Sequence, residues 1–560
     1  MPRGFPAGLI AVIALLVGAP PRQDAVVVRV DAAAGRGRMA PIWAFFGYDE
    51  PNYTYMKDGR KLLTELAAAS PVPVYVRTHN LLTTGDGRPA LKWGSTNAYT
   101  EDANGRARYD WTIVDRIFET YLERGMKPLV EIGFMPEALS RKPQPYRHQW
   151  APGNPYGEVF TGWAQPPVDY DKWRELVYQW GRHAIEKFGR AEVESWWWEV
   201  WNEPDIGYWQ GTPGDYFKLY DYAADGLKRA LPTARIGGPH STGPNGERAQ
   251  SFLRDFLEHC ARGRNDATGK TGTPLDYVGF HAKGAPRVTD AGHVRMGIAN
   301  QLTAIANGFA IVAASAFPRL PIVIGESDPE GCAACPARAY PQNAYRNGTM
   351  YSSYAAEQIA RTYELAREHK VNLLGSVTWA FEFEDQPFFD GFRDLATNGI
   401  DKPVLNVFRM LGRMDGEFVS ADSSGALPLA AVRDTGVRAA PDVNAIATRA
   451  ARRVAVLVWN YHDDDLPAPP SAIDLVVDHI PDGQVTVEHA RIDDDHSNAY
   501  QAWKRMGAPQ TPTADQYAAL EKAGQLASLG PPERRTSRDG QLRLSFALPR
   551  QGVSLVTIAW

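Results

Sequence analysis

Ser195-Trp-Trp-Trp-Glu-Val-Trp-Asn-Glu-Pro-Asp205 is the stretch on which the interpretation of this 560-residue chain depends. Its Trp and Val residues are typical of a β-strand that is buried on both faces. Pro204 has no backbone N–H to donate, so we expect the strand to end there. Asn202 and Glu203 then stand where a buried strand emerges. The surrounding indoles would desolvate the Glu203 carboxyl and raise its pKa, as a general acid at neutral pH requires. The alternative is a strand end with a structural ion pair.

Strand-like and helix-like segments alternate along the chain as far as about residue 414. Amphipathic segments such as 57–69, 171–188 and 351–369 predict helices between the strands. Eight strands, each followed by a helix, predict a (β/α)₈ TIM barrel over residues 40–414, with its chemistry at the C-terminal strand ends. The candidate strands end near Phe46, Arg77, Ile132, Trp201, Gly238, His281, Glu326 and Ala380.

The pattern changes after about residue 415. Short alternating segments such as 454–459, 473–477 and 553–558 indicate antiparallel strands, which predict a β-sandwich accessory domain over residues 415–560. We expect an early strand at 25–31 to complete this sandwich. An insertion near 512–538 contains one predicted helix, 513–527.

The composition indicates a globular body, with 44% apolar residues, 22% charged residues and a net charge of −5. No basic block indicates nucleic-acid binding. Residues 8–19 form an apolar run that is too short to span a bilayer but suits the core of a signal peptide. We therefore expect residues 1–24 to be a signal peptide and leader. The mature protein would be exported, periplasmic or secreted, with no membrane partner after signal removal. The alternative is a buried N-terminal helix.

The cysteines give little support for a metal site. Cys332 and Cys335 have no second ligand pair and no nearby His, which argues against zinc. In an exported protein the two could form a local disulfide, or both could remain thiols. No cofactor motif is present in the sequence.

Glu203 needs a partner to be more than a strand-end acid. Pro321-Ile-Val-Ile-Gly-Glu326 is a second buried-strand pattern that ends in a carboxylate. The two glutamates fall on strands 4 and 7, whose ends lie across the mouth of a barrel from each other. Carboxyl groups roughly 5 Å apart are typical of a retaining glycosidase, and a separation of roughly 6.5–9.5 Å is typical of an inverting one. The sequence leaves this distance open.

Trp201-Asn-Glu-Pro-Asp205 and Gly325-Glu-Ser-Asp-Pro329 resemble the strand-4 and strand-7 motifs of clan A glycoside hydrolases. More narrowly, the chain resembles glycoside hydrolase family 39, the family of β-xylosidases and α-L-iduronidases. The resemblance covers roughly residues 25–560, including an accessory-domain segment at 491–503. The narrower match rests on Val76-Arg-Thr-His79, Asp276-Tyr-Val-Gly-Phe-His281 and Asp401-Lys-Pro-Val-Leu-Asn406.

The resemblance implies a role for the central residues. Glu203 would be the acid/base and Glu326 the nucleophile. Asn202 would hydrogen-bond the 2-hydroxyl of the sugar, a contact that strengthens in the transition state. Arg77 would keep Glu326 ionised, because a nearby guanidinium favours the carboxylate. A core ion pair is the alternative for Arg77.

Four further residues are expected to contact the substrate. His79 and His281 would donate to sugar hydroxyls or orient the nucleophile, although a satisfied core histidine is the common alternative. Trp379 would be a stacking surface for the sugar, with simple barrel packing as the alternative. Glu382 would bind hydroxyls at the rim, unless it belongs to a solvated acidic loop.

Lys283 is the residue at which this chain departs from the β-xylosidases of the family. They often have Tyr in the pattern His-x-Tyr-Gly, whereas this chain has His281-Ala-Lys-Gly284. In the iduronidase branch a Lys at this place pairs with the substrate carboxylate. A Lys can equally bind neutral hydroxyls or the nucleophile. The aromatic-rich segment 381–389 is compatible with a pocket closed near C5, which favours xylosides.

We therefore expect a retaining exo-β-xylosidase that acts on β-1,4-xylooligosaccharides from the non-reducing end. The alternatives are an α-L-iduronidase-like or arabinosidase-like enzyme, or a non-catalytic carbohydrate-binding protein. The presence of both Glu203 and Glu326 argues against the last of these. The expected partner is an oligosaccharide, with no nucleic acid, cofactor or metal. The residues do not decide the oligomeric state, and a monomer is the default expectation.

Overall fold

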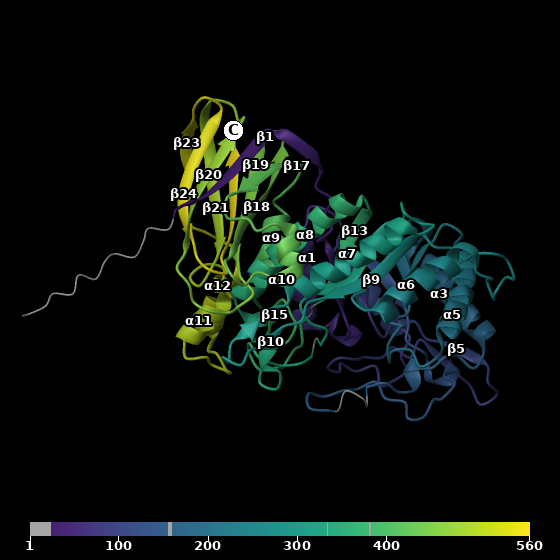
Figure 1. Cartoon of the computed structure of the whole chain (residues 1–560). Coiled ribbons are helices and arrows are strands. Elements are labelled where there is room, and N and C mark those ends of the chain that lie inside the picture. Colours follow the sequence, from purple (N-terminus) through teal and green to yellow (C-terminus); the bar gives the residue numbers. More distant parts are fainter. Residues whose placement is uncertain (1–23, 155–158, 333, 380–381) are drawn as a thin grey trace, which may run out of the picture.

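The computed structural model describes residues 24–154, 159–332, 334–379 and 382–560. Figure 1 shows two parts, a parallel sheet covered by helices and a second sheet that stands on one side of it. The predicted signal peptide, residues 1–24, lies outside the described residues except for Asp24.

The first sheet is a nearly closed parallel TIM barrel, as the sequence predicts. Its strand order is β13-β12-β9-β8-β7-β6-β3-β2-β14. β13 and β14 are two pieces of the eighth strand: β13 pairs with β12, and β14 pairs with β2 and so brings the two edges together. The strands are β2 (Phe45–Tyr48), β3 (Tyr75–Thr78), β6 (Lys127–Ile132), β7 (Trp197–Val200), β8 (Arg235–Ser241), β9 (Tyr277–Lys283), β12 (Pro321–Asp328), β13 (Asn372–Ser376) and β14 (Thr378–Trp379).

A helix follows each barrel strand, and local sequence sets several of the helix starts. α5 begins with a capping box in which Thr212 and Asp215 satisfy each other's backbone N–H groups. The very apolar α7 was not among the helices named from the sequence, because it is buried and its amphipathic pattern is weak. The barrel helices are α1 (Lys57–Ala69), α2 (Thr112–Leu122), α3 (Tyr170–Phe188), α5 (Pro213–Ala230), α6 (Glu247–Arg262), α7 (Ile298–Ala314), α8 (Thr349–His369) and α9 (Leu405–Leu411).

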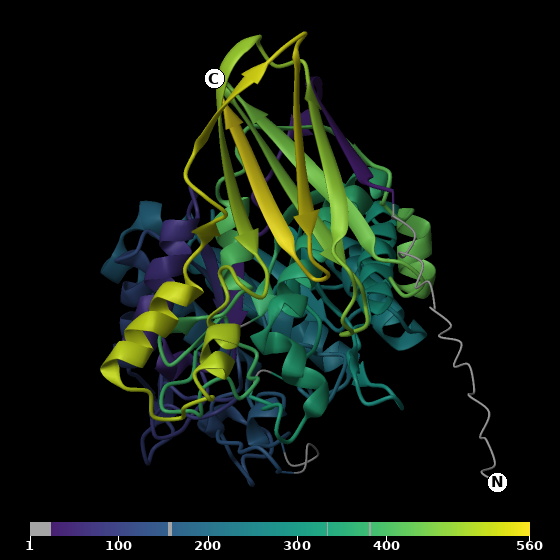
Figure 2. The same cartoon turned by 90° about the vertical axis from the view of Figure 1, so that its left-hand side faces the viewer.

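The second sheet is mostly antiparallel and forms the β-sandwich domain, with an apolar core of its own. β1 lies inside this sheet, antiparallel to β17 and parallel to β20, and is longer than the expected strand 25–31. Figure 2 shows these strands standing above the barrel. They are β1 (Val26–Arg38), β17 (Glu417–Ser423), β18 (Asp442–Ala450), β19 (Arg453–Tyr461), β20 (Ser471–Asp478), β21 (Gly483–Ile492), β22 (Ala527–Ser528), β23 (Glu533–Ser537), β24 (Gln541–Leu548) and β25 (Val553–Ala559).

The two domains share buried contacts. Arg361 on α8 pairs with Asp442 of β18 at 2.5 Å, and Trp459 of β19 donates to Glu357 on α8. Helices α11 (Ala499–Arg505) and α12 (Ala514–Gly524) project from the sandwich towards the barrel, where Trp503 packs against Phe389 at a ring-centroid distance of 5.1 Å. The sequence predicted α12 but not α11.

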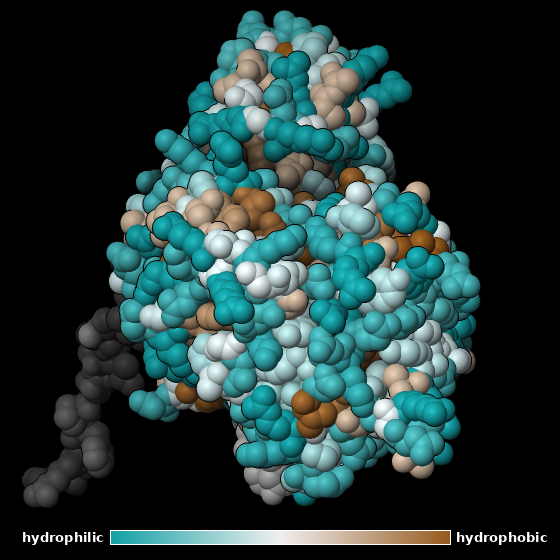
Figure 3. All heavy atoms as spheres, turned by 90° about the vertical axis from the view of Figure 1, so that its right-hand side faces the viewer, coloured by the Kyte–Doolittle hydropathy of each residue, from teal (hydrophilic) through white to brown (hydrophobic). Residues whose placement is uncertain are grey.

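Three further observations bear on the sequence interpretation. Cys332 and Cys335 form a disulfide, which settles the alternative that the sequence left open. None of the helices in the described ranges is both long enough and apolar enough to cross a bilayer. The face in Figure 3 is mostly hydrophilic, with hydrophobic residues in small separate patches.

Candidate active site

Glu203 and Glu326 stand at the carboxyl ends of two barrel strands. Glu203 lies three residues beyond β7, and Glu326 lies within β12. The backbone is left-handed at Trp201 (φ 73°) and at Glu203 (φ 44°), a conformation that costs free energy in residues other than Gly. A backbone hydrogen bond from Glu203 to the His240 carbonyl at 3.0 Å holds this kinked exit. The strand therefore turns abruptly where the sequence places Pro204.

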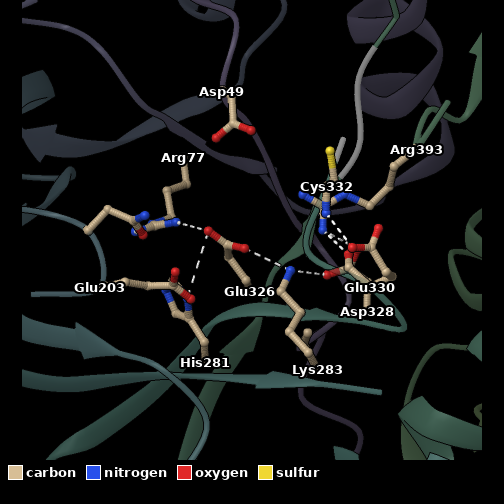
Figure 4. Close-up of polar contacts among 12 residues, drawn as sticks. Asp49, Arg77, Glu203, His281, Lys283, Glu326, Asp328, Glu330, Cys332 and Arg393 are labelled. Atoms are coloured by element: carbon tan, nitrogen blue, oxygen red, sulfur yellow. Dashed lines mark hydrogen bonds and ion pairs between the residues drawn. The ribbon is translucent and has the colours of Figure 1, made fainter. Parts of the chain in front are cut away.

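The two carboxyl groups approach each other closely, and His281 lies beside both of them. One oxygen of Glu203, one oxygen of Glu326 and a ring nitrogen of His281 all lie within 4.8 Å of one another. His281 Nδ1 is 2.9 Å from Glu203 Oε1 and 3.7 Å from Glu326 Oε1. Figure 4 shows Glu203 and His281 on one side of the Glu326 carboxylate. The imidazole thus contacts the expected acid/base more closely than the expected nucleophile.

Two cations hold Glu326 in its ionised form. Lys283 Nζ lies 2.7 Å from Glu326 Oε2, and Arg77 Nη1 lies 3.2 Å from Oε1. Burial by itself would raise the pKa of Glu326, but Lys283 and Arg77 keep that pKa well below its usual value. Glu326 is therefore a carboxylate at neutral pH, which is the form that a nucleophile needs.

Glu203 has the opposite electrostatic environment. Burial raises its pKa to about 7, and the negative charge of Glu326 adds to the effect. Burial also lowers the pKa of His281 to about 3, so this imidazole is neutral and adds no charge to the pair. Near neutral pH, Glu203 is thus protonated in about half of the molecules, whereas Glu326 is ionised. This is the division that a general acid and a nucleophile require.

Arg77 is the centre of a fully buried polar network. Its Nε donates to Glu199 Oε1 at 2.7 Å, and its Nη2 donates to Glu131 at 3.3 Å and to Asn202 Oδ1 at 3.0 Å. Burial would raise the pKa of Glu199, but Arg77 lowers it to about 2. Arg77 therefore makes a core ion pair and also contacts the nucleophile. Both alternatives that the sequence allowed for Arg77 are present together.

His79 connects this network to the first barrel strand. Its Nδ1 is 2.7 Å from Asp49 Oδ1 and its Nε2 is 3.0 Å from Glu131 Oε2. Burial would lower the pKa of His79, but Glu131 outweighs burial and raises it to about 9. The ring is thus cationic at neutral pH, 3.7 Å from Glu326 Oε1.

The structure does not expose Trp379 or Glu382 at the carboxylate pair. Trp379 is 1% exposed, and its ring packs against His79 at a centroid distance of 4.4 Å. Glu382 is fully buried and accepts a hydrogen bond from the Gly399 backbone N–H at 2.6 Å, so it secures a loop. The solvated acidic loop suggested for Glu382 is wrong, because its side chain is buried. A sugar contact for either residue stays a prediction.

Lys283 and Arg393 flank a further carboxylate, Asp328, at the end of β12. Lys283 Nζ lies 2.5 Å from Asp328 Oδ1, and Arg393 Nη1 lies 2.8 Å from Asp328 Oδ2. Figure 4 shows Lys283 between Glu326 and Asp328. Lys283 thus contacts Glu326, the expected nucleophile, which is one of the roles that the sequence allowed for this Lys.

Glu203, His281 and Glu326 have ligand atoms close enough together to hold a cation. Lys283 and Arg77 already supply positive charge to Glu326 at contact distance, which opposes metal binding there.

Sequence reasoning missed several charged residues of this site. Glu199 lies inside an otherwise apolar strand, and a charge at such a place signals a buried partner. Arg393 and Lys92 lie in loops with no periodic pattern, so nothing local pointed to them. Lys92 Nζ is 3.8 Å from Asp49 Oδ2, on the far side of the His79 ring from Glu131.

Comparison with known proteins identifies the family. The model of glycosyl hydrolases family 39 matches residues 26–541, nearly the whole chain. The chain belongs to this family. It is 26% identical over 499 residues to a β-xylosidase of Geobacillus stearothermophilus, with 86% of each chain covered. It is 28% identical over 600 aligned positions to human α-L-iduronidase, covering 99% of this chain and 82% of that protein.

Solved structures agree with the fold of this family 39 chain. A monomeric β-xylosidase from Caulobacter crescentus CB15 superposes with a TM-score of 0.73 at 20% identity, covering 95% of this chain and 99% of that one. A bacterial orthologue of human α-L-iduronidase superposes with a TM-score of 0.74 at 19% identity, covering 96% and 84%. The family match makes the protein a glycoside hydrolase, and the superpositions agree with its barrel and sandwich.

Proposed function

We propose that this glycosidase is a retaining, exo-acting β-xylosidase that releases xylose from the non-reducing end of β-1,4-xylooligosaccharides. The observation that carries the proposal is the close approach of the Glu203 and Glu326 oxygens, within 4.8 Å. That approach fits the roughly 5 Å spacing of a double-displacement site and leaves too little room for the water of an inverting one.

In the first step the Glu326 carboxylate attacks the anomeric carbon. A C–O bond forms to Glu326 as the glycosidic C–O bond breaks, and the Glu203 proton moves to the departing oxygen. The product is a glycosyl ester on Glu326 and a free alcohol. Asn202, whose Oδ1 accepts a hydrogen bond from Arg77 just beyond β7, would bind the 2-hydroxyl.

In the second step a water replaces the departed alcohol. Glu203 takes a proton from this water, whose oxygen bonds to the anomeric carbon while the ester bond to Glu326 breaks. Esterification has by then removed the negative charge of Glu326, which had raised the pKa of Glu203. The pKa of Glu203 therefore falls when it must act as a base.

Two observations favour xylose as the sugar. Aromatic rings line the eighth-strand loop, where Phe383 lies 5.6 Å from Tyr53 and 5.3 Å from Phe392 between centroids. Such a wall suits a sugar without a substituent at C5. The Geobacillus and Caulobacter proteins described above are also named β-xylosidases.

The test is the turnover of p-nitrophenyl β-D-xyloside. We expect Glu326→Ala to abolish turnover, and unchanged turnover would remove Glu326 as the nucleophile. Glu203→Ala should be rescued by azide to give β-xylosyl azide. An α-azide product would contradict retention.

A second candidate, an α-L-iduronidase-like activity on a uronic acid, is favoured by Lys283 and Arg393. These cations approach the same carboxylate, Asp328, and could reorient towards a substrate carboxylate. Human α-L-iduronidase is also among the relatives. Side-by-side rates on aryl xyloside, arabinoside and iduronide separate the candidates, and a strong iduronide preference would overturn the choice of xylose. We further propose that the protein is exported through the apolar segment 8–19.

A further inference from the structure

Glu50 is a buried carboxyl for which the described residues provide no hydrogen bond. It follows β2 at the C-terminal end of the barrel and is 0% exposed. Neither of its side-chain oxygens has a hydrogen-bond partner among the described residues. Burial raises the pKa of Glu50 well above its usual value, and the charge of Asp49 adds to the effect. Glu50 therefore presents a neutral carboxyl that has one O–H donor and one carbonyl acceptor.

Arg393 shows the same lack of partners on the neighbouring eighth-strand loop. Its Nη1 donates to Asp328, but its Nε and Nη2 have no partner in the described part of the chain, although the residue is 0% exposed. Arg393 is close enough to Glu50 to lower that carboxyl's pKa. The two unsatisfied groups come from separate elements and are close enough for their charges to interact. Buried polar groups that lack partners need an explanation, and a ligand supplies one.

The region around Glu50 and Arg393 borders the nucleophile on the side away from Glu203. The neighbour of Glu50, Asp49, contacts His79 at 2.7 Å, and His79 lies 3.7 Å from Glu326. Figure 4 places Asp49 and Arg393 across Glu326 from Glu203 and His281. A sugar whose anomeric carbon meets Glu326 would extend its far ring carbons into this region.

The order of the barrel strands indicates which hydroxyl arrives there. Asn202, after β7, would bind the 2-hydroxyl. Neighbouring strands follow in the order β7, β6, β3 and β2. His79 after β3 comes next around the mouth, followed by Glu50 after β2. The hydroxyls at C2, C3 and C4 also follow one another around the pyranose ring, so a sugar whose 2-hydroxyl meets Asn202 and whose ring runs in this order brings its 4-hydroxyl to Glu50.

We propose that Glu50 and Arg393 together bind the 4-hydroxyl of the terminal sugar, Glu50 as donor to its oxygen or acceptor of its proton and Arg393 as a second donor. This inference rests on the proposed glycosidase function. It also accounts for exo action, because the preceding sugar of a β-1,4-linked chain would be attached at this same oxygen. A 4-hydroxyl enclosed by buried groups leaves no space for that sugar.

The proposal separates stability from activity. A buried carboxyl without a partner destabilises the free protein, so an apolar residue of similar size should relieve that cost. We expect Glu50→Leu to leave the melting temperature unchanged or higher. The matched control is Glu357→Leu at the domain interface, because Glu357 is equally buried but accepts hydrogen bonds from Arg361 and Trp459. The control should melt lower and keep its activity.

Kinetics on deoxy substrates test the contact itself. On p-nitrophenyl β-D-xyloside we expect Glu50→Leu to lower kcat/KM by about 10- to 100-fold, the usual effect of losing a buried hydrogen bond. Glu50→Gln keeps a donor and an acceptor and should lose less than about five-fold. On the 4-deoxy xyloside the wild type and Glu50→Leu should have equal kcat/KM values, because the hydroxyl that Glu50 binds is missing. On the 2-deoxy xyloside Glu50→Leu should still have a kcat/KM about 10- to 100-fold lower than that of the wild type.

Three results would overturn the proposal. A lower melting temperature for Glu50→Leu with the same activity loss on every deoxy substrate would make Glu50 structural. Unchanged kcat/KM would show that it does not touch the sugar. Cancellation of the loss on the 3-deoxy instead of the 4-deoxy xyloside would assign it to another hydroxyl. If the wild type prefers a different aryl glycoside, the choice of xylose fails, and deoxy analogues of that glycoside test Glu50 in the same way.

Discussion

The pKa of Glu203 predicts how the rate of this enzyme depends on pH. Glu203 acts in the first step only when it is protonated, and its pKa is raised to about 7. Going from pH 6 to pH 8 lowers its protonated fraction from about nine-tenths to about one-tenth. For a substrate with a poor leaving group, such as xylobiose, kcat/KM should therefore fall by about ten-fold over this interval.

The leaving group distinguishes Glu203 from other groups that titrate nearby. Burial also raises the pKa of Glu131 to about 7, so a limb at this pH could have a second origin. A 2,4-dinitrophenyl xyloside departs without a proton, so its kcat/KM should not depend on the protonation of Glu203. Titration of Glu131 would act on both substrates equally. On the acid side, kcat/KM should not change with pH, because the pKa of Glu326 is held well below its usual value.

The assay measures initial rates for both substrates between pH 5 and pH 9, for the wild type and for Glu203→Gln. The variant should lose about 10²- to 10⁴-fold in kcat/KM on xylobiose and only a few-fold on the dinitrophenyl xyloside. A basic limb of equal size on the two substrates would refute the assignment of the proton to Glu203. So would a limb near pH 4.5, because it would mean that burial does not shift this group.

Three other predictions concern Lys283, the interface between the domains, and the N-terminal leader. Lys283→Met removes a cation that lowers the pKa of both Glu326 and Glu203, so the basic limb of the kcat/KM profile should move to higher pH and any loss of rate on the acid side should begin at a higher pH; a profile that stays in place would contradict the contact. Arg361→Met leaves Asp442 buried without its cation and should lower the free energy of unfolding by about 3–5 kcal/mol in urea denaturation, with kcat unchanged. Expression with the native leader should give an exported protein whose N-terminus, read by mass spectrometry, lies near residue 20, and retention of residues 8–19 in the mature protein would contradict the signal-peptide prediction.

The alternation of strands and helices was sufficient to predict the barrel. Buried parallel strands are continuous apolar runs, and a charge or Pro ends them, so Glu203 and Glu326 could be assigned to strands 4 and 7 from local composition alone. α7 was not predicted, because a helix that is apolar over most of its surface has little amphipathic signal. β18 is a mixed polar segment that becomes a strand through its pairing with β17 and β19.

The sequence was a poorer guide to the roles of side chains that depend on contacts with distant residues. Glu382 lies in a segment that the sequence places at the rim of the site, yet the fold buries its side chain against the Gly399 backbone. Arg77 was expected to keep Glu326 ionised, and in the structure its guanidinium also donates hydrogen bonds to Glu199 and Glu131. These contacts join residues that are distant in the chain, so no local pattern carries them.

The sequence by itself determined the fold class and the positions of Glu203 and Glu326 on strands 4 and 7, because burial periodicity and strand-ending residues are local properties. Only the tertiary structure decided which glutamate is protonated. Lys283 and Arg77 come from β9 and β3 to the nucleophile on β12, and their charges act through space. The same holds for Glu50, whose neighbours in the chain do not reveal that the fold leaves its carboxyl without a partner. The pKa values and the unsatisfied groups arise from distances between strands, which exist only once the barrel has closed.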